Sequence, residues 1–167
     1  KYFCKRVVAL SGGELSVHKI YRELQSQGYK IAKDTLYLWQ EYIEAIYLSR
    51  FVAKHAPSVV KSELSQKKSY VIDQGLGAAL DYKLGNDKGR LLETTVALEL
   101  IKQGKDIVYE RNGGECDFII REKDGGVVVM QVAYDMSDAT TRKREIKGLV
   151  YAAKQNKLGS GVIITYD

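Results

Sequence analysis

Apolar residues recur at helical spacing in three places within the first 45 residues of the chain. Residues 2–10 fit the last turns of a helix that ends at a Ser-Gly-Gly turn. Ser16 fits the N-cap of a second helix over 17–26, and Asp34 fits the N-cap of a third over 35–45. The pattern therefore predicts three short helices at the start of the chain.

Two extended segments are predicted after these helices. The first comprises the short apolar runs 46–48 and 51–52, and the second covers residues 58–64, beyond a loop at Pro57. Three helices followed by a hairpin-like pair of strands is the element order of a winged helix. In such a module the third helix usually enters the major groove of DNA.

The second half of the chain has the pattern of an α/β core. Predicted in order are a helix over 89–103, strands over 107–111 and 115–122, a returning strand after Asp124, a helix capped by Ser137 or Asp138, and a strand over 162–164. Residues 76–80 fit a helical turn and 82–88 a loop, and the last crossover is expected to be parallel. We therefore predict an α+β protein overall, with a winged-helix-like unit over residues 1–69 and an α/β core over 70–167.

Acidic and amide residues occupy regular positions in this core. Glu93 lies on the flank of the apolar face of its helix, where an acid is either partly buried for a reason or hydrogen-bonded at the first turn, which the helix dipole favours. Period two places Asp117 on one face of its strand, and Gln131 and Ala133 on one face of the next. A three-residue hairpin loop would set Asp117 opposite Ala133, with Gln131 diagonal to it, unless the register slips.

The charge is uneven along the chain. The formal net charge is +5, and residues 1–70 hold 12 of the 26 Lys and Arg but only 6 of the 21 Asp and Glu. This excess indicates an anionic partner such as DNA, although lysines of this number also occur on ordinary solvated surfaces. The candidate phosphate contacts are Lys30, Lys33, Lys54, Lys61, Lys67 and Lys68.

Three further observations concern groove insertion, the cellular compartment and the membrane. Glu41 and Glu44 on the third predicted helix would repel phosphates, so a spacer or protein-docking role for this unit stays open. Cys4 and Cys116 lack the spacing of a zinc site or a disulfide framework, which favours reduced thiols and the cytoplasm. No apolar run approaches the roughly 20 residues of a membrane span, so we expect no membrane partner.

Four stretches taken together carry a family resemblance: YVIDQGL at 70–76, KGRLLE at 88–93, GECDFII at 114–120 and VVVMQVAY at 127–134. They resemble the C-terminal region of prokaryotic AAA-type ATP-binding proteins, in which a P-loop module precedes a winged-helix-like segment and a domain of unknown function. The chain has no GxxxxGK[ST] motif and starts without methionine, so ATP and Mg²⁺ are expected in an upstream module of a longer protein.

The resemblance implies that the last domain is similar to the PD-(D/E)xK nuclease fold, also called restriction-endonuclease-like. Glu93 and Asp117 match its helical Glu and strand Asp, whereas Gln131 and Ala133 stand where the Glu and Lys of its ExK motif would be. Mg²⁺ or Mn²⁺ at Glu93 and Asp117 would be the expected metal site. Without the charged Glu and the Lys, the site is expected to be degenerate.

Three hypotheses follow from these residues. The first is a non-catalytic C-terminal region of an ATP-binding protein that binds DNA or docks onto the protein's own ATPase module. The second is a metal-dependent nuclease with a rearranged site of Glu93, Asp117 and Gln131, in which Lys143 or Lys147 could supply the missing cation. The third is a pure protein-interaction module. None of them defines an oligomeric state.

Overall fold

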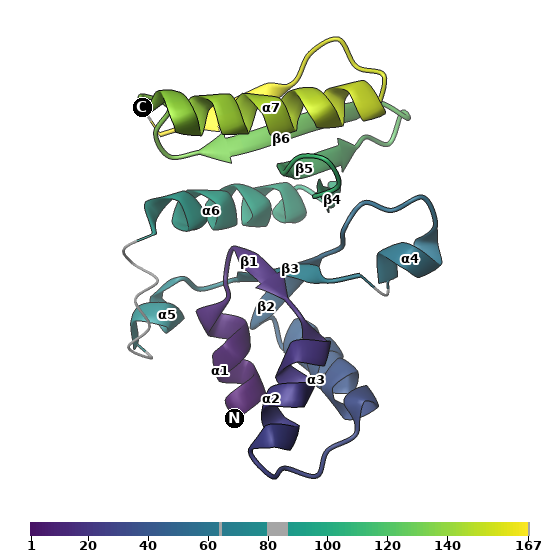
Figure 1. The fold of residues 1–167 in the computed structure, drawn as a ribbon, viewed down its shortest axis with the longest axis vertical. Coiled ribbons are helices and arrows are strands. Elements are labelled where there is room, and N and C mark those ends of the chain that lie inside the picture. The colour runs from purple at the N-terminus through teal and green to yellow at the C-terminus, as the bar shows by residue number, and fades with distance from the viewer. Residues whose placement is uncertain (64, 80–86, 167) are drawn as a thin grey trace.

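The computed structural model describes residues 1–63, 65–79 and 87–166, and its helices and strands form two sheets stacked along the long axis of the molecule (Figure 1). The mixed α+β architecture predicted from the sequence is confirmed. The elements around the first sheet are α1 (Tyr2–Ala9), β1 (Gly13–Leu15), α2 (Val17–Ser26), α3 (Lys33–Ala45), β2 (Ser49–Val52), α4 (Val59–Glu63) and β3 (Lys67–Val71). Then follow α5 (Gly75–Ala79), α6 (Lys88–Lys102), β4 (Asp106–Glu110), β5 (Cys116–Arg121), β6 (Val127–Ala133), α7 (Ala139–Gln155) and β7 (Val162–Thr165).

The three N-terminal helices lie where the periodicity predicts them. Ser16 caps α2, because its Oγ accepts a hydrogen bond from the Lys19 backbone N at 3.2 Å. The cap predicted for α3 is wrong, since the helix begins at Lys33 with the extended backbone of Ala32 before it. Asp34 instead lies in the first helical turn, where a negative charge is favoured by the helix dipole.

The first sheet has the order β1-β3-β2, with both pairings antiparallel. The extended piece predicted over 58–64 is wrong: residues 59–63 form the helix α4, and Leu64 lies outside the described residues. Ser58 explains the difference, because its Oγ accepts from the Lys61 backbone N and starts a helical turn. The strand that returns to β2 is β3, which spans the division expected between residues 69 and 70.

The second sheet has the order β4-β5-β6-β7 and is covered on both faces by helices (Figure 1). β4, β5 and β6 pair antiparallel, and β7 pairs parallel to β6, which confirms the predicted parallel crossover. Ala97 and Leu100 of α6 pack in one core with Phe118, while Leu149 and Ala152 of α7 pack in another. α6 therefore lies between the two sheets.

The β5–β6 hairpin has the predicted loop length but a different register. Glu122 N donates to Gly126 O at 2.8 Å, so the loop is 123–125, with Gly125 at a φ of +87°. Phe118 consequently pairs with Met130. Continued by one residue, this register places Gln131, rather than Ala133, beside Asp117.

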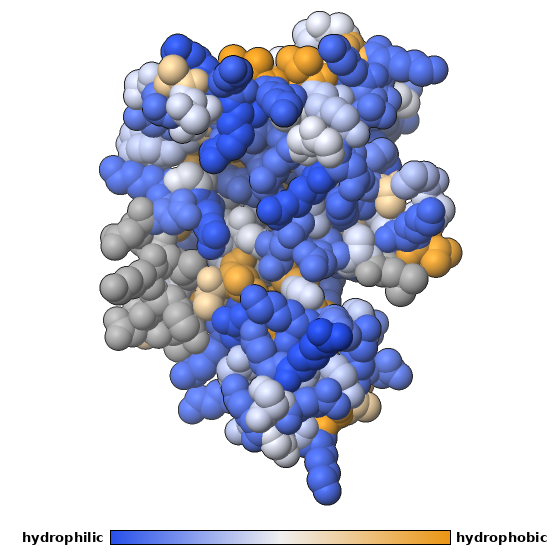
Figure 2. Space-filling model, viewed as in Figure 1, coloured by the Kyte–Doolittle hydropathy of each residue, from blue (hydrophilic) through white to orange (hydrophobic). Residues whose placement is uncertain are grey.

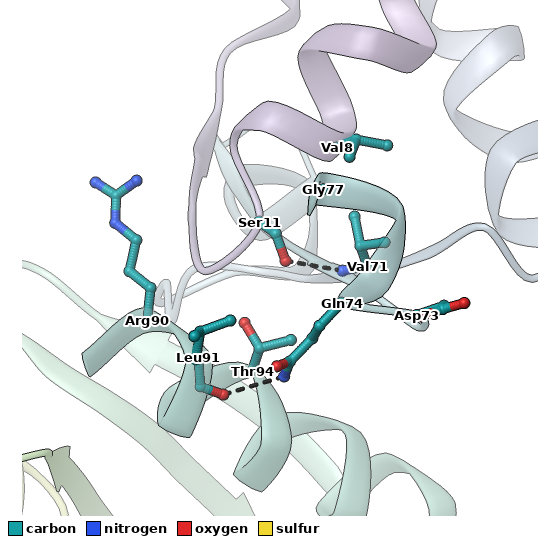
Figure 3. A pocket seen from close by; sticks show the side chains of 9 residues that line it. All are labelled: Val8, Ser11, Val71, Asp73, Gln74, Gly77, Arg90, Leu91 and Thr94. Carbon is teal, nitrogen blue, oxygen red and sulfur yellow. Dashed lines mark hydrogen bonds between the residues drawn. The ribbon is translucent and has the colours of Figure 1, made fainter. Parts of the chain in front are cut away.

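The two sheets share a continuous core. Val52 and Tyr70 from the first sheet belong to the same buried cluster as Phe118 from the second. Near this contact, Val71 N donates to Ser11 Oγ, and Gln74 Nε2 donates to the Leu91 carbonyl (Figure 3). The cavity that these residues line holds about 10 Å³, room for no more than one water. It is a packing gap between α1, α5 and α6 rather than a ligand site.

Two findings bear on the expected cellular setting. Cys4 is exposed and Cys116 is buried, and both are free thiols. In the described part of the chain, no helix has both the length and the apolar character needed to cross a membrane.

Candidate functional site

A polar cleft has a volume of about 830 Å³. Its walls are the start of β1 with the residue before it, the N-terminal part of α6, the ends of β5 and β6, and α7. All four residues that the resemblance assigned to a nuclease-like site line it, so the structure brings these residues together as predicted. They are Glu93, Asp117, Gln131 and Ala133.

A lysine from the first sheet reaches into the bottom of this cleft. The Nζ of Lys68 lies 2.9 Å from Glu93 Oε1 and 2.9 Å from Asp117 Oδ1. Glu115 Oε1 is 3.6 Å away, and the Lys68 side chain is only 3% exposed. One ammonium therefore lies among three carboxylates, which come from α6, from β5 and from the residue just before β5.

The alternation of side chains along β3 explains this placement. Lys68 and Tyr70 are two residues apart and share one face of the strand. The Tyr70 hydroxyl donates to the same Glu93 oxygen, at 2.7 Å. Lys68 as an exposed phosphate contact is therefore a wrong prediction, because its ammonium is buried in ion pairs.

The cluster has strong effects on proton affinity. Burial would lower the pKa of Lys68, but Asp117 and Glu93 outweigh it and raise that pKa above its ordinary value. Burial raises the pKa of Glu93 to about 7, with the Lys68 charge opposing and the Asp117 charge adding to the effect. Burial also raises the pKa of Tyr70, which keeps its proton for the bond to Glu93. Lys68 thus stays charged, and Glu93 is the group that takes up a proton near neutral pH.

This raised pKa predicts an unusual pH dependence of stability. Glu93 binds a proton more tightly in the folded chain than at its ordinary pKa of 4.5, so its contribution is present at low pH and is lost as pH rises toward 7. Between pH 5 and pH 8 the wild type should lose about 2 to 3 kcal/mol of unfolding free energy relative to Glu93→Gln. Urea unfolding of both proteins at the two pH values measures the difference. Parallel pH profiles would contradict the assignment.

Gln131 has a structural role that a glutamate could not fill. Its Oε1 accepts from the Asp117 backbone N at 3.2 Å, and its Nε2 donates to Glu145 Oε2. Asp117 Oδ2 in turn accepts from Val132 N at 3.0 Å, so side chains complete the hydrogen bonding where the β5–β6 ladder ends. A carboxylate at position 131 has no proton to donate and would face the charge of Glu145. The amide is thus matched to its surroundings.

The remaining predicted position adds no chemistry, and one buried acid of the cleft was missed. Ala133 is buried opposite Thr165 of β7 and offers no polar atom. Glu145 is buried on α7 and pairs with the exposed Arg144. Its sequence signal was a lone acid on a basic helix, four residues before the inward-facing Leu149.

Neither lysine suggested as a replacement for the ExK lysine reaches the carboxylates. Lys147 is exposed and lines the cleft, whereas Lys143 lies in a shallow groove with Ile146 and Val150. The cation at the carboxylates is Lys68, from a part of the chain that the sequence assigned to another unit.

The arrangement does not fit the divalent metal implied by the resemblance. The space between Glu93 and Asp117, where such an ion would have to lie, is filled by the Lys68 ammonium. Moreover, no group of three or more His, Cys, Asp or Glu side chains in residues 1–63, 65–79 and 87–166 is placed to hold a metal ion.

The other candidate phosphate contacts differ in their exposure and in their ion pairing. Lys30 and Lys61 are exposed, on the α2–α3 loop and on α4, while Lys33 and Lys54 are partly buried. Lys67 is held by Glu63 at 2.8 Å. Lys33 and Lys67 line a groove along α3 together with three acids, Glu41, Glu44 and Glu63.

Fold and cleft together define an α+β protein in which a lysine of one sheet neutralises a carboxylate pair of the other. Residues 88–167 match the family model of a domain of unknown function, DUF4143, which confirms that part of the expectation from the motifs. The chain is also similar to an uncharacterized protein of Methanocaldococcus jannaschii, with 32% identity over 168 residues. That alignment covers 96% of this chain but 36% of the relative, so the chain spans about a third of its length. No solved structure gives a significant match.

Proposed function

We propose that this chain is a non-catalytic docking module of a longer ATP-binding protein, built on a nuclease-like scaffold whose carboxylates are neutralised from within. One observation carries the proposal: Lys68 bridges Glu93 and Asp117 at 2.9 Å to each. Metal-dependent cleavage of a phosphodiester needs those carboxylates to bind metal ions, and here they bind a lysine side chain instead. Gln131 and Ala133 supply neither the charge nor the lysine of an ExK motif.

The length of the homologous protein supports the proposal that this chain belongs to a longer protein. The relative extends well beyond the region shared with this chain, which leaves room for a further module such as the expected P-loop ATPase. Docking onto that module or onto another protein is consistent with the first sheet's helices, since α3 exposes several large apolar side chains.

Plasmid cleavage tests the non-catalytic role. Supercoiled DNA is incubated with the chain in Mg²⁺ and, separately, in Mn²⁺, beside the matched Asp117→Asn variant. We expect the wild type to nick no more DNA than the variant. Metal-dependent nicking by the wild type that disappears in Asp117→Asn would instead establish a nuclease with a rearranged site.

A second candidate function, DNA binding by the first sheet and its helices, has its own observation. Within the described ranges, Lys30, Lys33, Lys54 and Lys61 make no ion pair, so their charges are available to phosphates. Their elements also follow the winged-helix order, helix-strand-helix-helix-strand-strand once α4 is set aside. The mixed charge of the groove along α3 argues for backbone contacts rather than base readout.

Fluorescence anisotropy of a labelled duplex tests this candidate. Binding that weakens steeply with added salt, and that is lost in Lys54→Glu/Lys61→Glu, would support phosphate contacts. Absence of binding at low salt would reject DNA as a partner.

A further inference from the structure

The solvent-facing side of α7 is uniformly basic. The charged residues exposed on this helix are Arg142, Lys143, Arg144, Lys147 and Lys154. Its single acid, Glu145, is buried and pairs with Arg144. The other cations of the helix form no ion pair with any residue in 1–63, 65–79 and 87–166. The charge of this face is therefore largely uncompensated.

Two apolar side chains interrupt the basic face. Ile146 and Val150 are four residues apart and are 42% and 44% exposed. The core does not need them, because Leu149 and Ala153 fill the inward positions of the same turns. Hydrophobic side chains show at the top of the molecule, over α7, among hydrophilic ones (Figure 2). An apolar centre with a charged rim is the usual anatomy of a protein-binding surface.

The apolar side chains and the cations line one and the same groove. It is shallow, holds about 460 Å³ and is formed by α7 alone. Its walls are two rows of side chains at four-residue spacing, Ala139, Lys143 and Lys147 in one and Arg142, Ile146 and Val150 in the other. Rows at this spacing are the ridges of a helix, and the groove between them accepts a ridge of another helix. The shape of the groove therefore points to a helical occupant.

We infer that this groove binds an acidic amphipathic helix of a partner protein. Apolar side chains of that helix cover Ile146 and Val150, and its carboxylates pair with Lys143 and Lys147 on the neighbouring row. The unpaired cations of the groove select an acidic partner over a basic one. The inference rests on the docking role proposed above and gives the partner's chemistry and its site.

Two other anionic partners fit the groove less well. A nucleic-acid backbone would pair with the cations, but it would leave Ile146 and Val150 without an apolar contact. A lipid surface binds a helix whose apolar face is free to enter the membrane. The apolar face of α7 is not free, since Leu149 and Ala152 pack in the core.

A designed peptide serves as the probe. It is alanine-based, about 18 residues long so that it is helical in isolation, and carries leucines four residues apart beside a row of glutamates. One helix in a shallow groove buries less than the roughly 1,200 Å² of stable interfaces, so binding on the order of micromolar or weaker is expected. Anisotropy of the labelled peptide should show saturable binding that weakens with salt. Matched peptides with serines for the leucines, or lysines for the glutamates, should bind at least tenfold more weakly.

Substitutions in the chain locate the site. Lys143→Glu/Lys147→Glu and Ile146→Ser should each weaken binding of the acidic peptide at least tenfold, because the first reverses the charge of one wall and the second removes an apolar contact. Lys19→Glu/Arg22→Glu, an equal change of charge at exposed positions of α2, should leave the affinity unchanged. Circular dichroism checks that all variants are folded.

The decisive arm exchanges the charges. The lysine peptide should bind Lys143→Glu/Lys147→Glu about as tightly as the glutamate peptide binds the wild type. Failure of this exchange, no binding of the glutamate peptide to the wild type, or equal binding of the serine peptide would each overturn the inference.

Competition distinguishes the other anionic partners. Duplex DNA or phosphatidylserine vesicles that displace the labelled peptide more effectively than the unlabelled peptide does would overturn the inference and assign the groove to nucleic acid or to lipid. Failure of the peptide to bind removes α7 as the docking surface, whereas plasmid cleavage tests the non-catalytic role separately, so the two failures are distinguishable.

Discussion

Replacing Lys68 with alanine should lower the free energy of unfolding by about 3 to 5 kcal/mol, the cost of leaving buried charges without their partner. The Lys68 side chain is 3% exposed, and its ammonium lies 2.9 Å from each of Glu93 and Asp117. Without it, two carboxylates face each other inside the protein, and either they repel or one must take up a proton. Chemical denaturation at pH 7.5 measures the loss.

Two variants distinguish the loss of the buried ion pairs from the effect on stability of removing any lysine. Lys67→Ala, on the same strand, removes an exposed pair with Glu63 and should cost less than about 1 kcal/mol. Lys68→Met combined with Glu93→Gln and Asp117→Asn removes all three charges and should recover much of the stability. A Lys68→Ala variant no less stable than Lys67→Ala would contradict the buried ion-pair cluster.

Gly148→Ala should destabilise the fold by about 3 kcal/mol, although alanine is the better helix former by about 1 kcal/mol. A Cβ at position 148 would lie 1.8 Å from the Glu115 carbonyl oxygen, and neither backbone can yield without moving α7 away from β5. Such a shift would also separate Glu145 from Gln131. Thermal and urea unfolding measure the cost.

Gly89→Ala is the matched control, since it too replaces a helical glycine. Its added Cβ would meet the Asp87 carboxylate at 3.5 Å, an ordinary contact, so the change should stay within about 1 kcal/mol of the wild type. Equal effects at positions 89 and 148 would show that α7 does not approach β5 as closely as the structure indicates.

Local signals explain the parts of the fold that the sequence predicts well. Ser16 and Asp138 cap α2 and α7 through bonds to backbone N–H groups three residues ahead, an interaction contained within a single turn. Glu93 could be singled out because it is an acid on the flank of the apolar face of its helix. The helices and the α+β class follow from such short-range features.

The register of the β5–β6 hairpin depends on a choice that the sequence leaves open. Gly125 and Gly126 are both able to take the left-handed position of the loop, and the structure uses Gly125. Moving the loop by one residue shifts every cross-strand pair by two residues. The predicted faces of the two strands are therefore right, whereas the predicted partner of Asp117 is wrong.

Lys68 could not be predicted because its partners are distant in the chain. Glu93 and Asp117 are 25 and 49 residues away, and a lysine on a polar stretch has the same local pattern whether it is solvated or buried. Gln131 is similar, because its fit to Asp117 and Glu145 shows only when three elements are assembled. Gln131 looks like a loss from a nuclease motif, but its amide is matched to the hydrogen-bonding groups around it in this core.

The central claim, that an internal ammonium occupies the place of a metal ion, is tested most directly by calorimetric titration of Mn²⁺ into the wild-type chain, with Asp117→Asn as the reference. Because Mn²⁺ would have to displace Lys68 from Glu93 and Asp117, no saturable binding is predicted up to millimolar concentration. Saturable micromolar binding by the wild type that is absent from Asp117→Asn would contradict the claim and reopen a metal-dependent activity for the cleft.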